Sequence, residues 1–390
     1  MDSDLTNEGF DDGLVQKPSK PPIYTEFDYI ELGNEFSSES LDSSVSHSSK
    51  EELKRILGET DKGLDIYNDD FVAKMSADLT IGELDLKLQA YSKMTMIAAP
   101  AKYKLSRVLG EMFSPLEKRS VLGLELLHLD GSTSKAGGQV IKNVAGYDLR
   151  KLYLGSFNSL AFIRSAYIRL EKTPILKLLL SEDMESLDDV DFQRWSSLFD
   201  FDVNQVESRL FISKDFAYEG TLPFTLGAEF YGTPDLLELR KQRILKNTGL
   251  DLNVLIMPFK KLYPSENQFK VDFSLKHSNL KAFVIELSSF LKSFSQGVQQ
   301  QCLKLEIDLI NATVRLFVKP HDFEIIRNAV IFQTLNSKYQ PVIRIRPLTL
   351  DNRLIERALN LSVSQDELQL LRRIKEKFDP EGRLNPGLLI

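Results

Sequence analysis

The sequence has little cysteine, little histidine and no long apolar run. Its single cysteine, Cys302, excludes an intramolecular disulfide and a cysteine-based metal cluster within the chain. The longest apolar run, Ile175–Leu180, is interrupted by Lys177 and is far shorter than the ~20 residues that span a bilayer. The acidic residues 1–4 are followed by no apolar stretch, so no signal peptide is expected. These absences favour a cytoplasmic protein.

The composition is that of a soluble globular protein whose negative charge lies at one end. Of 390 residues, 42% are hydrophobic and 27% are charged, and this length allows two or three domains. Residues 1–50 hold ten serines, 11 acidic and three basic side chains, whereas the other 340 residues hold 45 acidic and 46 basic ones. We therefore expect a disordered acidic tail over residues 1–49 and a nearly neutral folded part without a nucleic-acid-binding footprint.

Capping pairs and alternation of apolar residues predict the elements of the first half. Ser49 with Glu52 indicates a helix to Leu57, and Thr80 with Glu83 indicates a helix that runs to about Tyr91. Strands are expected at Val121–Asp130, with a turn at Asp130-Gly131, and at Leu160–Leu170.

After Pro174 strand-like and helix-like runs alternate, which is typical of an α+β domain. The expected helices are Pro234–Asn247, Leu280–Leu291 and Ser364–Phe378. The expected strands are Arg209–Ser213, Phe224–Tyr231, Leu252–Met257, Val271–Leu275, Leu303–Leu309 and Thr313–Val318.

Few residues suggest catalysis. The chain lacks GxGxxG after a strand, GxxxxGK[ST], HExxH and GxSxG, and no metal site is expected. None of its four histidines indicates a catalytic base. His47 lies in the tail, and His128 shares a strand face with leucines. His277 and His321 lie beside expected helix starts, where capping or solvent exposure is the simpler interpretation. Cys302 is most simply a small buried hydrophobe. No catalytic residue can be named.

The informative region is residues 135–149, which read KAGGQVIKNVAGYDL. Three glycines within ten residues allow a ligand to approach the main chain, and their N–H groups can form a concavity that holds phosphate or carbonyl oxygens. Lys142 would add a positive charge, and Tyr147 a flat apolar face. A pair of tight turns explains the same glycines equally well, so residue chemistry alone leaves both interpretations open.

Two segments of the chain resemble one family. The first segment is residues 138–149, followed by Lys151-Leu152 and Gly155-Ser156. It resembles the FAD-binding subunit of glycolate oxidase. That subunit belongs to the family whose FAD-binding domain is of the vanillyl-alcohol oxidase and p-cresol methylhydroxylase (PCMH) type. Residues 378–387, FDPEGRLNPG, resemble the closing motif of the same family. The weaker similarity extends over roughly residues 60–390.

The resemblance implies an α+β fold: a truncated PCMH-type bipartite FAD-binding domain with an inserted cap domain. FAD would lie extended between two lobes, in a domain of residues 50–175 closed by residues 346–390, beneath an α+β cap of residues 176–345. The residues that would contact FAD, carried over position by position, are Gly137, Gly138, Asn143, Gly146, Tyr147, Asp148, Gly155, Ser156, Leu160, Ile163 and Asn385. In such proteins the flavin performs the hydride chemistry, and the protein supplies position and electrostatics.

The chain departs from the family pattern in two places. The first βαβ lobe with its R-G-G-G-T phosphate loop is missing, because residues 50–130 contain only isolated glycines. In the G-S-x-G-T-L-G stretch, two glycines are replaced by Asn158 and Ala161. Three hypotheses therefore stay open: an FAD-binding subunit that oxidises a small 2-hydroxy acid with a larger flavoprotein subunit and an iron–sulfur subunit as partners, a flavin-free structural or regulatory subunit, and a binder of another nucleotide.

Overall fold

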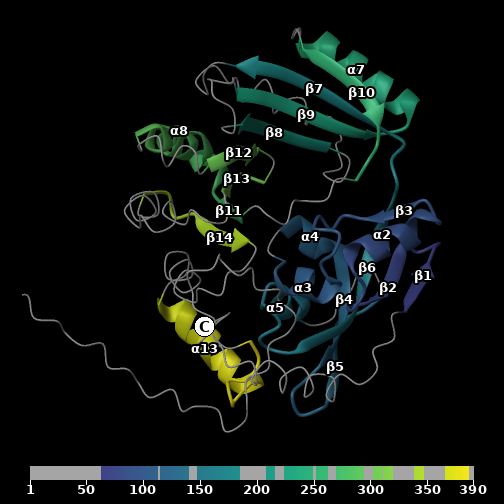
Figure 1. The fold of residues 1–390 in the computed structure, drawn as a ribbon, viewed down its shortest axis with the longest axis vertical. Helices are drawn as coiled ribbons and strands as arrows, with labels where there is room; N and C mark the ends of the chain where they lie inside the picture. The colour runs from purple at the N-terminus through teal and green to yellow at the C-terminus, as the bar shows by residue number, and fades with distance from the viewer. Residues whose placement is uncertain are drawn as a thin grey trace, which may run out of the picture.

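Two antiparallel sheets, each with its own helices, make up the described part of the molecule (Figure 1). The computed structural model describes residues 63–112, 115–139, 147–184, 208–215, 224–248, 252–261, 269–293, 302–309, 311–318, 338–346 and 365–385. The expected acidic tail, the helix from Ser49, and His47, Lys142 and His321 lie outside these residues, as do Asn143 and Gly146.

The first sheet has the strand order β1-β2-β6-β4-β5, and β3 pairs with the far end of β6. Its long central strand β6 pairs with β2, β3 and β4, and every pair is antiparallel. The strands are β1 (Leu64–Tyr67), β2 (Val72–Ser76), β3 (Lys93–Thr95), β4 (Val121–Leu127), β5 (Thr133–Gly137) and β6 (Phe162–Lys172). The strands predicted at 121–130 and 160–170 are therefore confirmed, and the turn at Asp130-Gly131 returns the chain from β4 to β5.

Helices pack on this sheet around one apolar core. They are α2 (Ile81–Gln89), α3 (Leu105–Gly110), α4 (Pro115–Ser120), α5 (Arg150–Tyr153) and the distant α13 (Gln365–Phe378), which reaches the core through Ile374 and Phe378. The capping box at Thr80 and Glu83 is confirmed, with both reciprocal hydrogen bonds formed. The helix ends at Gln89 rather than near Tyr91, because Ser92 adopts a left-handed conformation (φ 53°) that turns the chain into β3.

The second sheet has eight strands in the order β10-β7-β9-β8-β12-β13-β11-β14. They are β7 (Leu176–Met184), β8 (Ser208–Asp215), β9 (Phe224–Gly232), β10 (Asn253–Pro258), β11 (Phe269–Ser274), β12 (Cys302–Asp308), β13 (Thr313–Val318) and β14 (Val342–Arg346). Helices α7 (Pro234–Thr248) and α8 (His277–Ser293) accompany the sheet, and the Phe283 ring of α8 lies 5.3 Å from that of Phe273 on β11. The expected strands and helices of this region are confirmed, while β7 and β14 were not predicted.

A partly buried ion pair joins the two sheets. Lys261, just after β10, places Nζ 2.8 Å from Asp85 Oδ1 on α2, and it also donates to Thr95 Oγ1 and to Thr95 O, each at 3.2 Å. Burial lowers the pKa of Lys261 although the Asp85 carboxylate opposes this shift. The pair fixes the side of the second sheet that carries β10 against α2 and β3 of the first sheet.

The central strands of the first sheet carry a carboxylate whose ionisation stabilises the fold. Burial of Glu125 would raise its pKa, but hydrogen bonds from Lys74, Ser165 and Lys135 outweigh that effect and lower the pKa to about 2. A carboxyl group with a lowered folded-state pKa stabilises the protein above its unfolded pKa of ~4.3, and this contribution is lost as the pH falls toward about 2.

We therefore expect Glu125→Gln to lower the free energy of unfolding by about 2 kcal/mol at neutral pH, and by little near pH ~2.5, where wild-type Glu125 loses its advantage. Urea unfolding of both proteins across this pH range measures the difference. A difference that stays constant with pH would contradict the assigned role of the ionised carboxylate.

Candidate functional site

The residues predicted to contact a cofactor form two groups on the first sheet. One group lies at the end of β5 and the start of α5, and consists of Gly137, Gly138, Tyr147 and Asp148. The other lies between α5 and β6 and is joined by the carboxyl-terminal turn; it consists of Gly155, Ser156, Leu160, Ile163 and Asn385. Asn143 and Gly146 fall outside the described residues, so their places stay a prediction.

Close packing of the protein's own backbone explains one glycine of the first group. Gly137 has φ +78°, and a Cβ there would lie 2.3 Å from Leu122 O and 2.7 Å from Arg150 Cδ. Gly123, opposite on β4, would likewise push a Cβ to 2.6 Å from Gly138 N. At Gly138 itself, no atom of the described residues other than its chain neighbours lies within 4 Å of the position of a Cβ. The side of the main chain at Gly138 is therefore open to a ligand.

Arg150 organises the first group and was not predicted from the sequence. Its guanidinium donates to both carboxylate oxygens of Asp148, at 2.6 and 2.9 Å, and to Val121 O at 2.5 Å. The hydrogen bonds from Arg150 hold the pKa of Asp148 below its ordinary value despite partial burial. Asp148 is thus bound to the sheet, whereas Tyr147 beside it is 96% exposed and presents its ring to the surface.

The second group contains a strained turn. Gly155 (φ 85°), Phe157 (φ 54°) and Asn158 (φ 52°) all lie in the left-handed region, which non-glycine residues rarely adopt. Two main-chain hydrogen bonds fix this turn to the end of α3, because Gly155 N donates to Leu109 O and Phe157 N to Gly110 O. Backbone strain of this kind persists only where surrounding contacts enforce it, and it clusters at ligand-binding sites.

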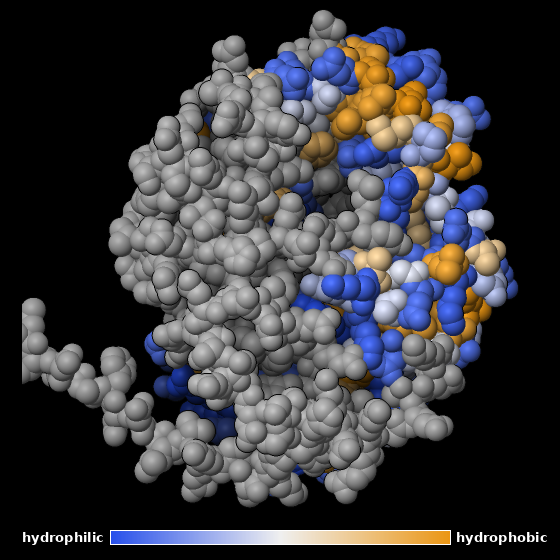
Figure 2. Space-filling view, in the orientation of Figure 1, coloured by the Kyte–Doolittle hydropathy of each residue, from blue (hydrophilic) through white to orange (hydrophobic). Residues whose placement is uncertain are grey.

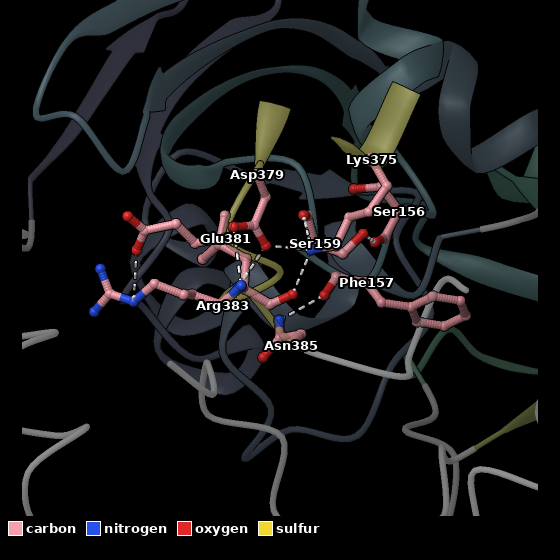
Figure 3. A network of polar contacts seen from close by, with 9 residues as sticks. Ser156, Phe157, Ser159, Lys375, Asp379, Glu381, Arg383 and Asn385 are labelled. Atoms are coloured by element: carbon pink, nitrogen blue, oxygen red, sulfur yellow. Dashed lines mark hydrogen bonds and ion pairs between the residues drawn. The ribbon is translucent and has the colours of Figure 1, made fainter. Parts of the chain in front are cut away.

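The carboxyl-terminal turn after α13 is seated on this strained turn (Figure 3). Lys375 Nζ lies within 2.6–2.7 Å of three oxygens: Ser159 O, Asp379 Oδ2 and Leu384 O. The Asp379 carboxylate in turn accepts the main-chain N–H groups of residues 383 and 384. Asn385, which is fully buried, donates through Nδ2 to Phe157 O at 2.7 Å. Two segments more than 200 residues apart therefore form one cluster.

The structure places the remaining predicted residues inside the protein. Ser156, Leu160 and Ile163 are at most 5% exposed, and the Ser156 hydroxyl donates to Tyr153 O. These residues could contact a cofactor only through main-chain atoms, or after the surrounding protein had moved. Their role as cofactor contacts stays a prediction.

The two side chains that replace glycines of the family pattern pack inside the protein. Asn158 donates through Nδ2 to Ser106 O on α3 and packs where a Cβ on Gly110 would come within 3.0–3.1 Å of its carboxamide. Ala161 is buried in the core of the first sheet. Asn158 Oδ1 is buried, and no donor of the described residues reaches it. The replacements therefore leave the open side of Gly138 unobstructed, and the described residues fit a group bound through main-chain atoms.

Neighbouring strands of the first sheet pair only antiparallel among the described residues. Strands β2 and β3 both run antiparallel to β6 and are connected by α2, so these two strands run parallel to each other. That the first lobe is shortened stays a prediction.

No proton-transfer site emerges from the described histidines. His128 Nε2 lies 2.7 Å from Ser134 Oγ, and its ring stacks on Phe378 of α13, as expected for a satisfied rim residue. His277, the first residue of α8, is exposed, which agrees with the solvent-exposed interpretation. In the described part of the chain, no group of three or more potential metal ligands occurs, and no helix is long and apolar enough to cross a membrane.

Two comparisons of sequence match local parts of the chain. Residues 354–389 match the family described as FAD linked oxidases, C-terminal domain. A stretch of 68 residues is 37% identical to glycolate oxidase subunit GlcD of Bacillus subtilis (strain 168). That stretch covers 17% of this chain and 14% of GlcD, so the similarity to GlcD is local.

Solved structures establish the fold. Carbohydrate oxidase from Microdochium nivale superposes with a TM-score of 0.56 at 14% identity, covering 84% of this chain and 80% of the oxidase. Physcomitrella patens BBE-like 1 superposes with a TM-score of 0.55 at 12% identity, and the match covers 84% of this chain and 79% of that protein. Alkyldihydroxyacetonephosphate synthase gives 0.54 at 13% identity; the match covers 84% of this chain but 66% of the synthase, slightly under two thirds of its length.

The expected fold class is thereby confirmed, since these neighbours share the mixed helix-and-sheet architecture inferred from the two motifs. The carboxyl-terminal segment thus resembles FAD linked oxidases, a local stretch of the chain resembles GlcD, and the fold is similar to that of the solved structures above; together these resemblances support FAD as the cofactor.

Proposed function

We propose that this chain is an FAD-binding oxidoreductase subunit that takes part in oxidising a small 2-hydroxy acid in the cytoplasm. One observation carries the proposal: the turn of residues 379–385, within the segment that matches FAD-linked oxidases, sits on the strained turn of residues 155–159. The name of its relative, glycolate oxidase subunit GlcD, supports the class of substrate and membership of a multi-subunit complex.

The first sheet and α13 would hold the cofactor, within the domain proposed for residues 50–175 and 346–390. When bound, FAD would accept the hydride of the substrate. Gly138 would receive the extended part of the cofactor, and the Arg150–Asp148 pair would hold the start of α5 beside the end of β5. Asn385 and the turn at residues 155–158 would enclose the other end, with Tyr147 available as a flat aromatic face.

Substrate recognition is proposed to involve other chains. A carboxylate substrate needs a cation, but Arg315, which is half-buried in the second sheet, already pairs with Asp272 and Glu306 at 2.8 and 2.9 Å. His128 is bound to Ser134 and His277 is exposed, so neither is placed as a base. We therefore propose that a larger flavoprotein subunit supplies the base and that an iron–sulfur subunit takes the electrons, while residues 176–345 act as a cap.

The open side of Gly138 gives a sharp test. Because no atom in the described part of the chain, apart from the neighbouring residues, lies within 4 Å of a Cβ at this position, Gly138→Val should leave the stability of the protein unchanged and yet weaken FAD binding by at least about tenfold. Visible absorption of the purified full-length protein, FAD release on denaturation and thermal unfolding of the apoprotein measure the two effects.

Gly131→Ala provides the opposite control. Gly131 also has an open Cβ position, but φ is +83° and the residue lies in the turn between β4 and β5. This variant should lose about 1 kcal/mol of stability and keep its affinity for FAD. Normal FAD binding by Gly138→Val would show that the cofactor lies elsewhere.

A flavin-free structural subunit is the second candidate. It is favoured by the burial of Ser156, Leu160, Ile163 and Asn385 within the protein itself. A protein that stays colourless after incubation with FAD, and that still co-purifies with a flavoprotein partner, would establish this alternative.

A further inference from the structure

The edge of the second sheet exposes an apolar strand. Strand β10 is at the end of the strand order, and Val254, Leu255 and Ile256 are 40%, 51% and 42% exposed. No charged side chain interrupts the run Val254–Met257. Figure 2 shows apolar side chains gathered over this end of the molecule, near α7 and β10. Natural proteins protect such edges with charges, bulges or a covering element, so an unprotected apolar edge marks a contact surface.

The hydrogen bonds of β10 show which of its main-chain groups face outward. Pro258 lies opposite Leu176 of β7, and the next residue, Phe259, donates its N–H to Ile175 O. In an antiparallel pair, residues that exchange hydrogen bonds alternate with residues that do not. Residues 253, 255 and 257 therefore bond to β7, whereas Val254, Ile256 and Pro258 point their main-chain groups away from the sheet.

The position of Pro258 agrees with this assignment. Proline has no N–H to donate and is tolerated in strands where that side of the chain faces solvent. The free edge consequently offers N–H donors at Val254 and Ile256 and no donor at Pro258.

We propose that β10 pairs with β10 of a second copy of this chain, antiparallel, with the two-fold axis at Leu255. Val254 of each copy then exchanges two main-chain hydrogen bonds with Ile256 of the other, which uses all four donors and all four acceptors of these residues. A register that places Val254 or Ile256 opposite Pro258 leaves a carbonyl without its donor. The main-chain donors and acceptors on the outer side of β10 therefore match those of a second, antiparallel β10.

The side chains are also self-complementary under this axis. Val254 and Ile256 lie on the face of the sheet that carries the buried Leu178 and Leu180 of β7, because they are their cross-strand partners. Each would meet the other across the axis on that face, while the two Leu255 side chains would meet on the opposite face. Isologous contacts of this kind close a dimer, and the sheet would continue through both copies.

A disulfide tests the register. At the axis, Leu255 and its symmetry mate form a non-hydrogen-bonded pair with a Cα–Cα distance of ~4.5 Å, within the range that a disulfide bridges. Leu255→Cys should form a covalent dimer under mild oxidation at least about tenfold faster than Asn253→Cys, whose two copies lie roughly 14 Å apart. The wild-type chain, with only Cys302, is oxidised in parallel.

Sedimentation velocity of the full-length chain tests the surface. The wild type should be dimeric, and the double variant Val254→Lys/Ile256→Lys should be monomeric, whereas Leu86→Lys, at a 71% exposed site on α2, should remain dimeric. A monomeric wild type, a dimer that survives the double substitution, or equal cross-linking at 255 and 253 would overturn the proposal. An edge strand donated by a different protein would appear as a monomeric wild type.

Discussion

Lys375→Met is expected to lower the free energy of unfolding by about 3–5 kcal/mol, because it removes the cation from a buried ion pair. The partner, Asp379, is fully enclosed, and the ammonium also satisfies Ser159 O and Leu384 O. Burial lowers the pKa of Lys375, although the hydrogen bond that its ammonium donates to Asp379 opposes this shift. The loss should also release the carboxyl-terminal turn from residues 155–159 and with it any bound FAD.

Urea unfolding and FAD retention measure this effect, and a double-mutant cycle assigns it. Asp379→Asn in the Lys375→Met background removes the buried charge that Lys375→Met leaves behind, so the double variant should be less destabilised than the sum of the single ones. Lys377→Met, two residues further along α13 on its exposed face, serves as the control and should change stability by less than about 0.5 kcal/mol. Additive single effects would mean that the ion pair contributes no coupling.

Arg315→Leu is expected to cost about 3–5 kcal/mol as well, through the second sheet. Arg315 on β13 lies between Asp272 on β11 and Glu306 on β12, and both carboxylates are 6% exposed. Burial acts to lower the pKa of Arg315, but the two carboxylates raise it above its ordinary value. Without the guanidinium, two buried negative charges would lie on either side of β13, with no cation between them.

The pH dependence identifies the cause. In Arg315→Leu the pKa values of Asp272 and Glu306 should rise above their unfolded values, so the variant should lose stability as the pH increases from ~4 to ~7. Urea unfolding across this range measures the slope, and the triple variant that adds Asp272→Asn and Glu306→Gln should recover most of the loss. A pH-independent loss would indicate a packing defect instead.

Local signals in the sequence predicted much of the fold. The capping box at Thr80, the turn at Asp130-Gly131 and the stop of α13 before Asp379-Pro380 each act within a few residues, so one window of sequence contains their cause. Strand β5 (TSKAG) was not predicted because it has no apolar alternation and Thr133 is its only β-branched residue; it pairs with β4, where Gly123 lies opposite Gly137. Strand β7 was recognised as an apolar run and not as a strand, because the strands with which it pairs, β9 and β10, lie far away in the sequence.

The candidate site, too, was predicted in part. The two motifs indicated which segments belong together, and Asn385 does lie against the turn at Phe157. The groups that hold these segments were not predicted, since Lys375 and Arg150 resemble ordinary helical surface residues until their distant partners, Ser159 and Val121, are placed. The same holds for Lys261, whose partner Asp85 is 176 residues away.

The sequence by itself determined the helix caps, the tight turns, the alternating strands and the two segments that carry the family resemblance, because short-range sterics and hydrogen bonding decide these features. The tertiary structure alone decided which charges are buried, which glycine has an open side and which strand is left at the edge of a sheet. Burial, clearance and strand pairing depend on chain segments that meet only after folding.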